Sequence, residues 1–269
     1  MTAPALILLA PGSDESHATQ VMHALRKRMQ ELRPGLSIHL AFTKNFSPTP
    51  SQVVATLHSR NVEEAVLVPL DITHATELPE AMMTVVEQLQ AAYPALHLTM
   101  SRPIGPACEL LSVLDLRLRH ALSACHQLEV DGLVLSAPDD GDPRGAVLMA
   151  RRAQQWRSHH HLPVQLAHGT QPGHDVPSAI AALRSQGRRS IAVGSFFLTA
   201  DQCYTEQAEQ ALHHGAVVVS APIGVDERLL DVAMARYSVS ALDLLDGLDD
   251  VPDDAAPDAA TALAPAVNE

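Results

Sequence analysis

The sequence predicts an α/β fold made of two tandem Rossmann- or flavodoxin-like βαβ repeats, each with a four-stranded, mostly parallel sheet flanked by helices. Three observations predict it. Short apolar runs alternate with segments whose apolar residues recur at three- and four-residue spacing, which is typical of βαβ units. Two of these runs end in similar small-residue loops, LILLAPGSDES at 6–16 and GLVLSAPDDGDP at 132–143. Further blocks of the first half recur, in order, in the second.

Eight apolar runs are the expected strands. In chain order they are 4–10, 36–42, 65–70, 96–101, 132–137, 163–168, 190–197 and 216–221. Between them, residues 18–32 carry apolar side chains along one helical face. Residues 79–93 form a second such segment, and Pro79 and Glu80 suit its first turn. Strands alternating with helices imply a parallel sheet that is covered on both faces.

The matched blocks indicate an internal duplication. PSQVVATLHSRNVEEAVLVPL at 50–70 corresponds to VPSAIAALRSQGRRSIAVGSF at 176–196. LHLTMSRPIGPACELLSVL at 96–114 corresponds to GAVVVSAPIGVDERLLDVA at 215–233. We therefore expect each half of the chain to form one four-stranded unit.

The duplication and the composition of the C-terminus divide the chain into three expected parts. Residues 1–126 form an N-terminal α/β domain, and residues 127–246 form a C-terminal α/β domain. Residues 247–269 contain six acidic residues and no basic one. This tail has too few large apolar side chains to offset the entropy of ordering, so we expect it to be disordered.

Composition excludes several classes of protein. The net charge of −13 argues against a nucleic-acid binder, which normally carries a basic face. No apolar run is long enough to cross a bilayer, and the N-terminus lacks the basic start of a signal peptide. We expect a cytoplasmic protein without a membrane partner.

The three cysteines lack CxxC spacing, so we expect buried thiols rather than a disulfide framework or a zinc ribbon. The histidines at 159–161 suit a solvated loop.

Ligands of open α/β sheets bind beyond the carboxyl ends of the strands, so the loops at those ends are expected to line a cleft. These loops are 11–16, 43–49, 71–78 and 102–106, and in the second half 138–143, 169–175, 197–203 and 222–226. Neither GxGxxG nor GxxxxGKS occurs, and we expect no nucleotide cofactor.

The first loop has two interpretations. Pro11, Gly12 and Ser13 lead into a helix expected to start near Glu15. Free N–H groups at a helix start bind anions, and these residues are candidates for substrate binding. The alternative is a tight turn in which Ser13 or Asp14 caps the helix.

The loop in VPLDITHATELPEAM, residues 68–82, carries the most chemistry. Asp71 and Thr73 are candidate substrate-binding residues, and His74 is a candidate catalytic residue and metal ligand. A neutral imidazole binds divalent metals or accepts a proton near physiological pH. Glu77 would orient His74 or share a metal with it. Alternatively, His74 is an exposed loop histidine and Glu77 a favourable first-turn acid.

These motifs together resemble the sirohydrochlorin chelatases, the class II cobalt- or iron-chelatases, and especially their two-repeat actinobacterial form. The resemblance covers roughly residues 4–240. It is carried by ILLAPGS, VPLDITHATELPEAM, RPIGPACELLSVL, LVLSAPDDGDPRG, IAVGSFFLTADQ and SAPIGVDERLLDVAMARY. It implies a cleft between two α/β halves that accepts a tetrapyrrole with many carboxylates. Ferrous iron or cobalt is inserted there without ATP, and two histidines at strand ends bind the metal and take the pyrrole protons.

The chain departs from this family at the metal-binding histidines. Pro11 stands where the family has its first-loop histidine, and proline offers neither a ligand nor a base. In the second loop, Thr73 falls on the histidine column, and His74 matches it with a one-residue slip. His17, one turn into the first helix, is a candidate substitute ligand.

Arginines are expected to compensate for the acidic residues of the cleft. Asp14, Glu15, Asp71 and Glu77 would attract a metal cation but repel a polycarboxylate. Arg102 and Arg144 are candidate substrate-binding residues that would offset this repulsion, because a guanidinium pairs bidentately with a carboxylate. For Arg144 the alternative is an exposed arginine on the first turn of a helix.

The leading hypothesis is a tetrapyrrole chelatase that inserts ferrous iron or cobalt during sirohaem or cobalamin biosynthesis, with His74 and Glu77 at its centre. The alternative is a non-catalytic relative that binds a tetrapyrrole or a metal ion as carrier, scaffold or sensor, because Pro11 replaces a catalytic histidine. A third hypothesis is a different small-molecule reaction or a protein partner. A homodimer is left open.

Overall fold

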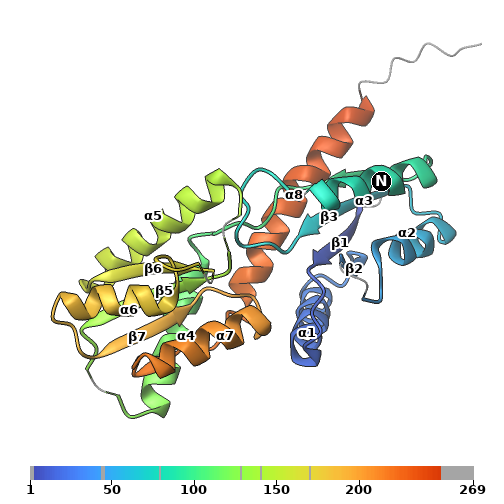
Figure 1. Cartoon of the computed structure of the whole chain (residues 1–269). Helices are drawn as coiled ribbons and strands as arrows, with labels where there is room; N and C mark the ends of the chain where they lie inside the picture. The colour runs from blue at the N-terminus through green and yellow to red at the C-terminus, as the bar shows by residue number, and fades with distance from the viewer. Residues whose placement is uncertain are drawn as a thin grey trace, which may run out of the picture.

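Each half of the molecule is built around one four-stranded sheet (Figure 1), and the two sheets have the same strand order. The structure is a computed structural model that describes residues 3–43, 46–78, 80–127, 129–139, 141–169 and 171–249. The strand orders are β2-β1-β3-β4 and β6-β5-β7-β8, and every neighbouring pair is parallel. The predicted pair of parallel α/β repeats is confirmed.

All eight predicted strands are present. Those of the first sheet are β1 (Ala5–Ala10), β2 (Ile38–Phe42), β3 (Glu64–Pro69) and β4 (His97–Met100). Those of the second are β5 (Gly132–Ala137), β6 (Val164–His168), β7 (Ile191–Ser195) and β8 (Val218–Val219). The helices between them are α1 (Ser16–Leu32), α2 (Pro50–Ser59), α3 (Glu80–Ala92), α4 (Leu110–Ala124), α5 (Pro143–His160), α6 (Val176–Ser185), α7 (Gln202–His213) and α8 (Glu227–Asp249).

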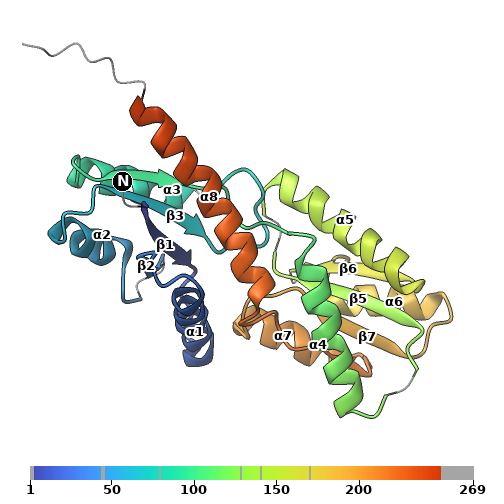
Figure 2. The same ribbon diagram turned by 180° about the vertical axis from the view of Figure 1, so that it is seen from behind.

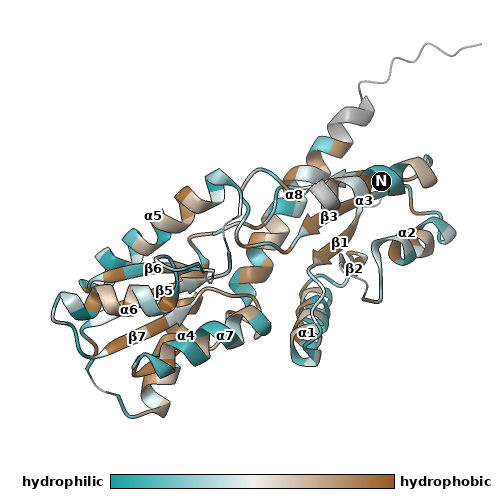
Figure 3. Cartoon of the chain, viewed as in Figure 1, coloured by the Kyte–Doolittle hydropathy of each residue, from teal (hydrophilic) through white to brown (hydrophobic). Residues whose placement is uncertain are grey.

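The central strands are continuous apolar runs because helices cover both of their faces. Every residue of β1 and of β5 is buried. In β1, Leu6 and Leu8 enter one core cluster, while Ile7 and Leu9 enter another on the opposite face. Colouring by hydropathy shows the strands as predominantly hydrophobic, with hydrophilic residues on the outer turns of α5 and α7 (Figure 3).

Side-chain caps begin α2, α5, α6 and α7, whereas α1 and α4 have none. Thr49 forms a capping box with Gln52 at α2, and Asp142 and Asp175 cap α5 and α6. The N-cap residue of α1 is Glu15, and it has no side-chain cap. The alternative that Ser13 or Asp14 caps this helix is therefore wrong: the Ser13 hydroxyl oxygen only accepts the Glu15 N–H at 3.2 Å.

The last helix of each half packs against the sheet of the other half. Helix α4 lies against β7 and β8, and α8 lies against β3 and β4 (Figure 2). Hydrogen bonds hold this exchange: Arg117 of α4 donates to the Ile223 carbonyl at 2.7 Å, and the Tyr237 hydroxyl of α8 donates to the Pro4 carbonyl at 2.7 Å. The proposed boundary between residues 126 and 127 therefore separates the two sequence repeats. It does not separate two independently packed bodies, because α4 and α8 each cover the sheet of the other half.

Three further expectations concern the ends and the thiols. Helix α8 ends at Asp249, so the first three residues of the expected acidic tail are helical, and residues 250–269 lie outside the described residues.

No described helix is long and apolar enough to span a bilayer. Cys108 and Cys125 are exposed and Cys203 is half-buried, so the expectation of three buried thiols is wrong.

Replacing Tyr237 with Phe tests the helix exchange. The variant loses one buried hydrogen bond to Pro4 and is expected to unfold with a free energy lower by about 1 kcal/mol. Urea denaturation measures the loss. Tyr93→Phe is the matched control, because Tyr93 is half-buried and its hydroxyl has no partner among the described residues. Equal losses in both variants would contradict the assignment.

Candidate functional site

A cavity of about 550 Å³ opens where the carboxyl ends of the two sheets face each other. The loops after β1 and β3 line it from the first half, and the loops after β5 and β7 line it from the second. Pro11 and Pro138, the matched prolines of the two repeats, both contribute to the wall. The predicted cleft is therefore present, although the loop at 102–106 borders a different cavity and the described residues of the loops at 169–175 and 222–226 line neither one.

The lining of this cleft carries a strongly negative charge. Six carboxylates contribute to it, and among the residues that the structure describes no Lys, Arg or His does. The six are Asp14, Glu15, Asp71, Asp139, Asp201 and Glu206. Acidic walls of a concave site attract cations and repel anions.

A second cavity, of about 330 Å³, carries the opposite charge. Its lining includes four arginines and, within the described part of the chain, no acid. The four are Arg102, Arg144, Arg152 and Arg236. Arg152 and Arg236 are partly held by backbone carbonyls of the 103–106 loop, whereas Arg102 and Arg144 have no hydrogen-bond partner among the described residues. This arrangement suits a carboxylate-rich or otherwise anionic ligand.

The loop after β3 borders both cavities. Thr73 faces the acidic cleft, while Ala75 and Thr76 border the arginine cavity. One carboxylate organises the start of this loop: Oδ1 of Asp71 accepts the N–H groups of Thr73 at 2.7 Å and His74 at 2.9 Å, and the Thr73 hydroxyl at 2.9 Å. Asp71 thereby folds the loop into a tight turn.

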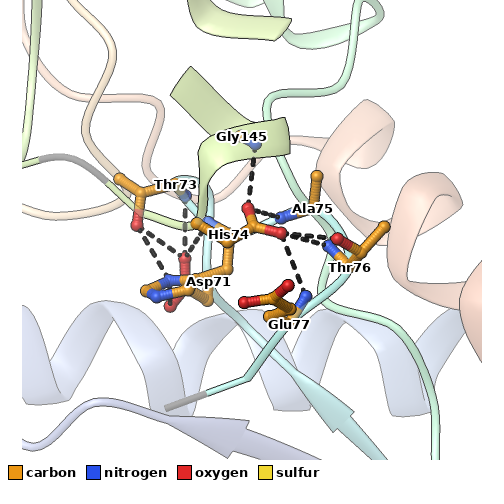
Figure 4. Close-up of polar contacts among 8 residues, drawn as sticks. Asp71, Thr73, His74, Ala75, Thr76, Glu77 and Gly145 are labelled. Atoms are coloured by element: carbon orange, nitrogen blue, oxygen red, sulfur yellow. Dashed lines mark hydrogen bonds and ion pairs between the residues drawn. The ribbon is translucent and has the colours of Figure 1, made fainter. Parts of the chain in front are cut away.

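Asp71 also fixes the imidazole of His74. Its Oδ2 lies 2.8 Å from Nδ1 of His74 (Figure 4). A carboxylate only accepts hydrogen bonds, so this contact favours the neutral tautomer in which Nδ1 carries the proton and Nε2 has the free lone pair. The side chain of His74 is 22% exposed. This is the arrangement in which a histidine held by a carboxylate presents its other nitrogen to a metal or a proton.

The second half holds the same loop through Asp142. Its Oδ1 accepts the N–H of Ala75 at 2.8 Å, and its Oδ2 accepts the N–H and hydroxyl of Thr76 and the N–H of Glu77. The same side chain caps α5 by accepting the Gly145 N–H at 2.8 Å. Figure 4 shows Gly145 and the three loop residues converging on one carboxylate.

This carboxylate is ionised at neutral pH. Burial of Asp142 disfavours its charged form, but hydrogen bonds from the Thr76 hydroxyl and from three backbone N–H groups outweigh that effect and hold the pKa of Asp142 well below its usual range. The interaction therefore lasts through the whole physiological pH range.

Two glycines allow the approach of α5 to the loop. Added Cβ atoms at Gly141 and Gly145 would overlap the carbonyl group of Thr73. Only glycine leaves room for this contact between two backbone segments. The GDPRG motif in the sequence is thus explained by packing: Asp142 is the cap, Pro143 suits the first turn, and Gly145 admits the loop.

The other predicted site residues are placed as follows. Pro11, Gly12, Ser13, Asp71 and Thr73 line the acidic cleft. Arg102 and Arg144 line the arginine cavity, so the expectation that they neutralise the acids within the cleft is wrong. Glu77 donates its N–H to Asp142, and its exposed carboxylate makes no hydrogen bond with His74 in the described structure. His74 itself lines neither cavity, and His17, which is exposed on α1, lines neither of them as well.

Several residues of the site are not singled out by the sequence. Asp139, Asp201, Glu206 and Cys203 line the cleft from the second half, although three of these four belong to the loops at 138–143 and 197–203 that are expected to line the cleft. Burial raises the pKa of the Cys203 thiol, so this side chain enters the cleft in its neutral form. Asp142 precedes a proline at a helix start, which predicts a cap but not its contacts with the first half.

The fold and the cleft define a class of two-repeat α/β proteins that resembles known metal chelatases of tetrapyrroles. The sirohydrochlorin chelatase SirB from Bacillus subtilis subspecies spizizenii, in complex with cobalt, superposes with a TM-score of 0.73 over 90% of this chain and 96% of its own, at 15% identity. SirB from Bacillus subtilis with Fe³⁺ gives a TM-score of 0.73 over 91% and 98%, at 15% identity.

A CbiX described as the terminal enzyme for biosynthesis of siroheme in denitrifying bacteria superposes with a TM-score of 0.60, at 17% identity, over 88% of this chain and 98% of its own. Residues 5–121 match the CbiX family model. No protein with a curated description matches the chain. The N-terminal half of the chain is thus similar to the CbiX family, and about nine-tenths of the chain has the fold of the sirohydrochlorin chelatases.

Replacing Asp142 with Asn is expected to lower the free energy of unfolding by about 3 kcal/mol at neutral pH, because an amide has one acceptor oxygen for five donors. A carboxyl with a depressed pKa stabilises the fold above its unfolded-state pKa and loses this contribution as the pH falls. The difference from wild type should therefore shrink below about pH 4. Urea titrations at several pH values measure it.

Asp175→Asn is the matched control, since Asp175 caps α6 inside the second half by accepting the Ser178 N–H at 3.0 Å. A lost cap is expected to cost about 1 kcal/mol. Similar losses in the two variants would refute the role of Asp142 as the contact between the halves.

Proposed function

We propose that this protein inserts a divalent metal ion into a tetrapyrrole in the acidic cleft, with the Asp71–His74 pair as its proton acceptor and metal ligand. The observation that carries the proposal is the 2.8 Å contact between Asp71 Oδ2 and His74 Nδ1, made by a loop that borders the cleft between the repeats. The fold shared with SirB and CbiX supports it. The metal, ferrous iron or cobalt, is a substrate.

Insertion replaces two pyrrole N–H protons by one divalent ion. The six carboxylates of the cleft concentrate the cation near the ring. Nε2 of His74 accepts one proton, and the negative charge of Asp71 stabilises the imidazolium that results. A carboxylate of the lining accepts the other proton, because Pro11 offers no base where the family has a histidine.

The departure at Pro11 and the charge of the lining favour a second candidate function. A cleft with six carboxylates, and with no Lys, Arg or His in its described lining, holds a metal ion more readily than a polycarboxylate ring. In this candidate the protein binds the metal without inserting it and serves as a carrier or sensor.

The arginine cavity provides the charge that a carboxylate-rich tetrapyrrole requires. Arg102 and Arg144 have no partners among the described residues and border the same loop as the cleft. We infer that they bind acidic side groups of the tetrapyrrole, while the ring nitrogens face the cleft.

His74→Ala tests the chemistry. Loss of a general base is expected to slow metal insertion about 100-fold or more, measured as the change in absorbance of sirohydrochlorin with Co²⁺ or Fe²⁺. Asp71→Asn should slow it as well, because the amide no longer holds Nδ1 protonated. His17→Ala is the control, since His17 is exposed and, unlike His74, has no carboxylate partner among the described residues, and its rate should equal that of wild type.

The same titration separates the two candidates. Metal-dependent turnover of the tetrapyrrole supports insertion. Metal binding that depends on His74 without any change of the tetrapyrrole spectrum supports the carrier or sensor. Wild-type insertion by His74→Ala would exclude the Asp71–His74 pair as the reactive group.

Arg102→Gln and Arg144→Gln test the binding of the acidic side groups. Each variant is expected to raise KM about tenfold with little change in kcat, since a charge-assisted hydrogen bond contributes about 1.5–3 kcal/mol. Arg157→Gln is the control, because Arg157 is exposed in the last turn of α5 and lines neither cavity. A kcat effect without a KM effect would contradict this role.

A further inference from the structure

A cluster of three potential metal ligands lies outside both cavities. Asp115 of α4 faces His159 and His160, the last two residues of α5. One ligand atom from each residue can be chosen so that all three lie within 4.8 Å of one another. The sequence interpretation of residues 159–161 as a solvated loop is therefore wrong for these two residues, which are helical.

The distances suit a shared ion. Nε2 of His159 lies 3.4 Å from Oδ2 of Asp115. Two ligand atoms that each lie about 2.1 Å from a tetrahedral zinc ion are separated by about 3.4 Å. Nε2 of His160 lies 2.7 Å from Oδ1 of Asp115, a hydrogen-bond distance that has to widen slightly when an ion replaces the proton.

The surroundings hold the carboxylate in place and leave the histidines accessible. The Trp156 indole N–H donates to Oδ1 of Asp115, as outer-shell donors orient metal-binding carboxylates. The side chain of Asp115 is 13% exposed, and that of His159 is 62% exposed. An ion can therefore enter from solvent, and water can complete its coordination.

We propose that Asp115, His159 and His160 form a binding site for a divalent transition metal that is separate from the cleft. Two imidazoles and one carboxylate suit zinc, cobalt and their neighbours rather than magnesium or calcium. Helix α5 runs for 18 residues from its cap at Asp142, which contacts the loop after β3, to His160, which is about 27 Å at 1.5 Å per residue. A bound ion would link α4 from the first half to α5 from the second.

Isothermal titration of the full-length protein with Zn²⁺ tests the site, with Co²⁺ as a spectroscopic probe. Wild type is expected to bind one Zn²⁺ ion that His74→Ala still binds, and the melting temperature should rise with the Zn²⁺ concentration. The double variant His159→Gln/His160→Gln should bind this ion at least tenfold more weakly and should lose the visible absorption bands of bound Co²⁺.

A second histidine pair provides the matched control. His213 is the last residue of α7 and His214 is its C-cap. Their ring centroids lie 5.3 Å apart, similar to the 4.9 Å between those of His159 and His160. Both are exposed, and neither belongs to a three-ligand group among the described residues. His213→Gln/His214→Gln should bind Zn²⁺ as wild type does.

The single variant His159→Gln excludes a mere folding defect. It leaves the contacts of Asp115 with His160 and Trp156 intact, so its melting temperature without metal should equal that of wild type while its Zn²⁺ affinity falls. Unchanged Zn²⁺ affinity in the 159/160 double variant, or an equal loss in the 213/214 variant, would overturn the proposal. Neither result depends on whether the cleft inserts metal.

Discussion

One carboxylate connects the two halves at the point where the chemistry is expected. Asp142 begins helix α5 and accepts three backbone N–H groups and one hydroxyl from the loop around Thr76, together with the Gly145 N–H of its own helix. The loop that carries His74 therefore cannot take this conformation without the second repeat. The second repeat supplies the support, and Asp71 of the first repeat aims the imidazole.

The charges around this loop are separated. The net charge of the protein is −13, yet four arginines gather on one side of the loop, and six carboxylates line the cleft on the other. Like charges in one cavity repel each other unless a counter-charge binds there. The acidic cleft therefore favours a cation, and the arginine cavity favours an anion. A metal ion has the first charge, and the carboxylates of a tetrapyrrole have the second.

Much of the fold could be predicted from the sequence because its signals are local. The apolar runs of β1 and β5 and the repeated blocks define the strands, their parallel order and the cleft. The exchange of α4 and α8 could not be predicted, since the two helices have the same apolar pattern and either sheet can accept either of them. Only contacts distant in sequence, such as that of Tyr237 with Pro4, decide between the two arrangements.

The part of the site that could be predicted is likewise the part that depends on residues close in sequence. Asp71, Thr73 and His74 are close in sequence, and their loop brings them together. Glu77 was expected to orient His74 with its carboxylate, but it contacts Asp142 through its backbone N–H. Asp71 is the carboxylate that contacts the imidazole of His74. The arginines and the Asp115 cluster depend on tertiary contacts, which spacing does not reveal.

The exchange of α4 and α8 has a consequence for how the chain assembles. A chain with a single repeat would leave one sheet face without its covering helix, and a second molecule would have to supply it at a rate and extent that depend on protein concentration. Joining two repeats makes that association intramolecular, with an effective concentration set by the connecting segment. Dilution then no longer separates the partners.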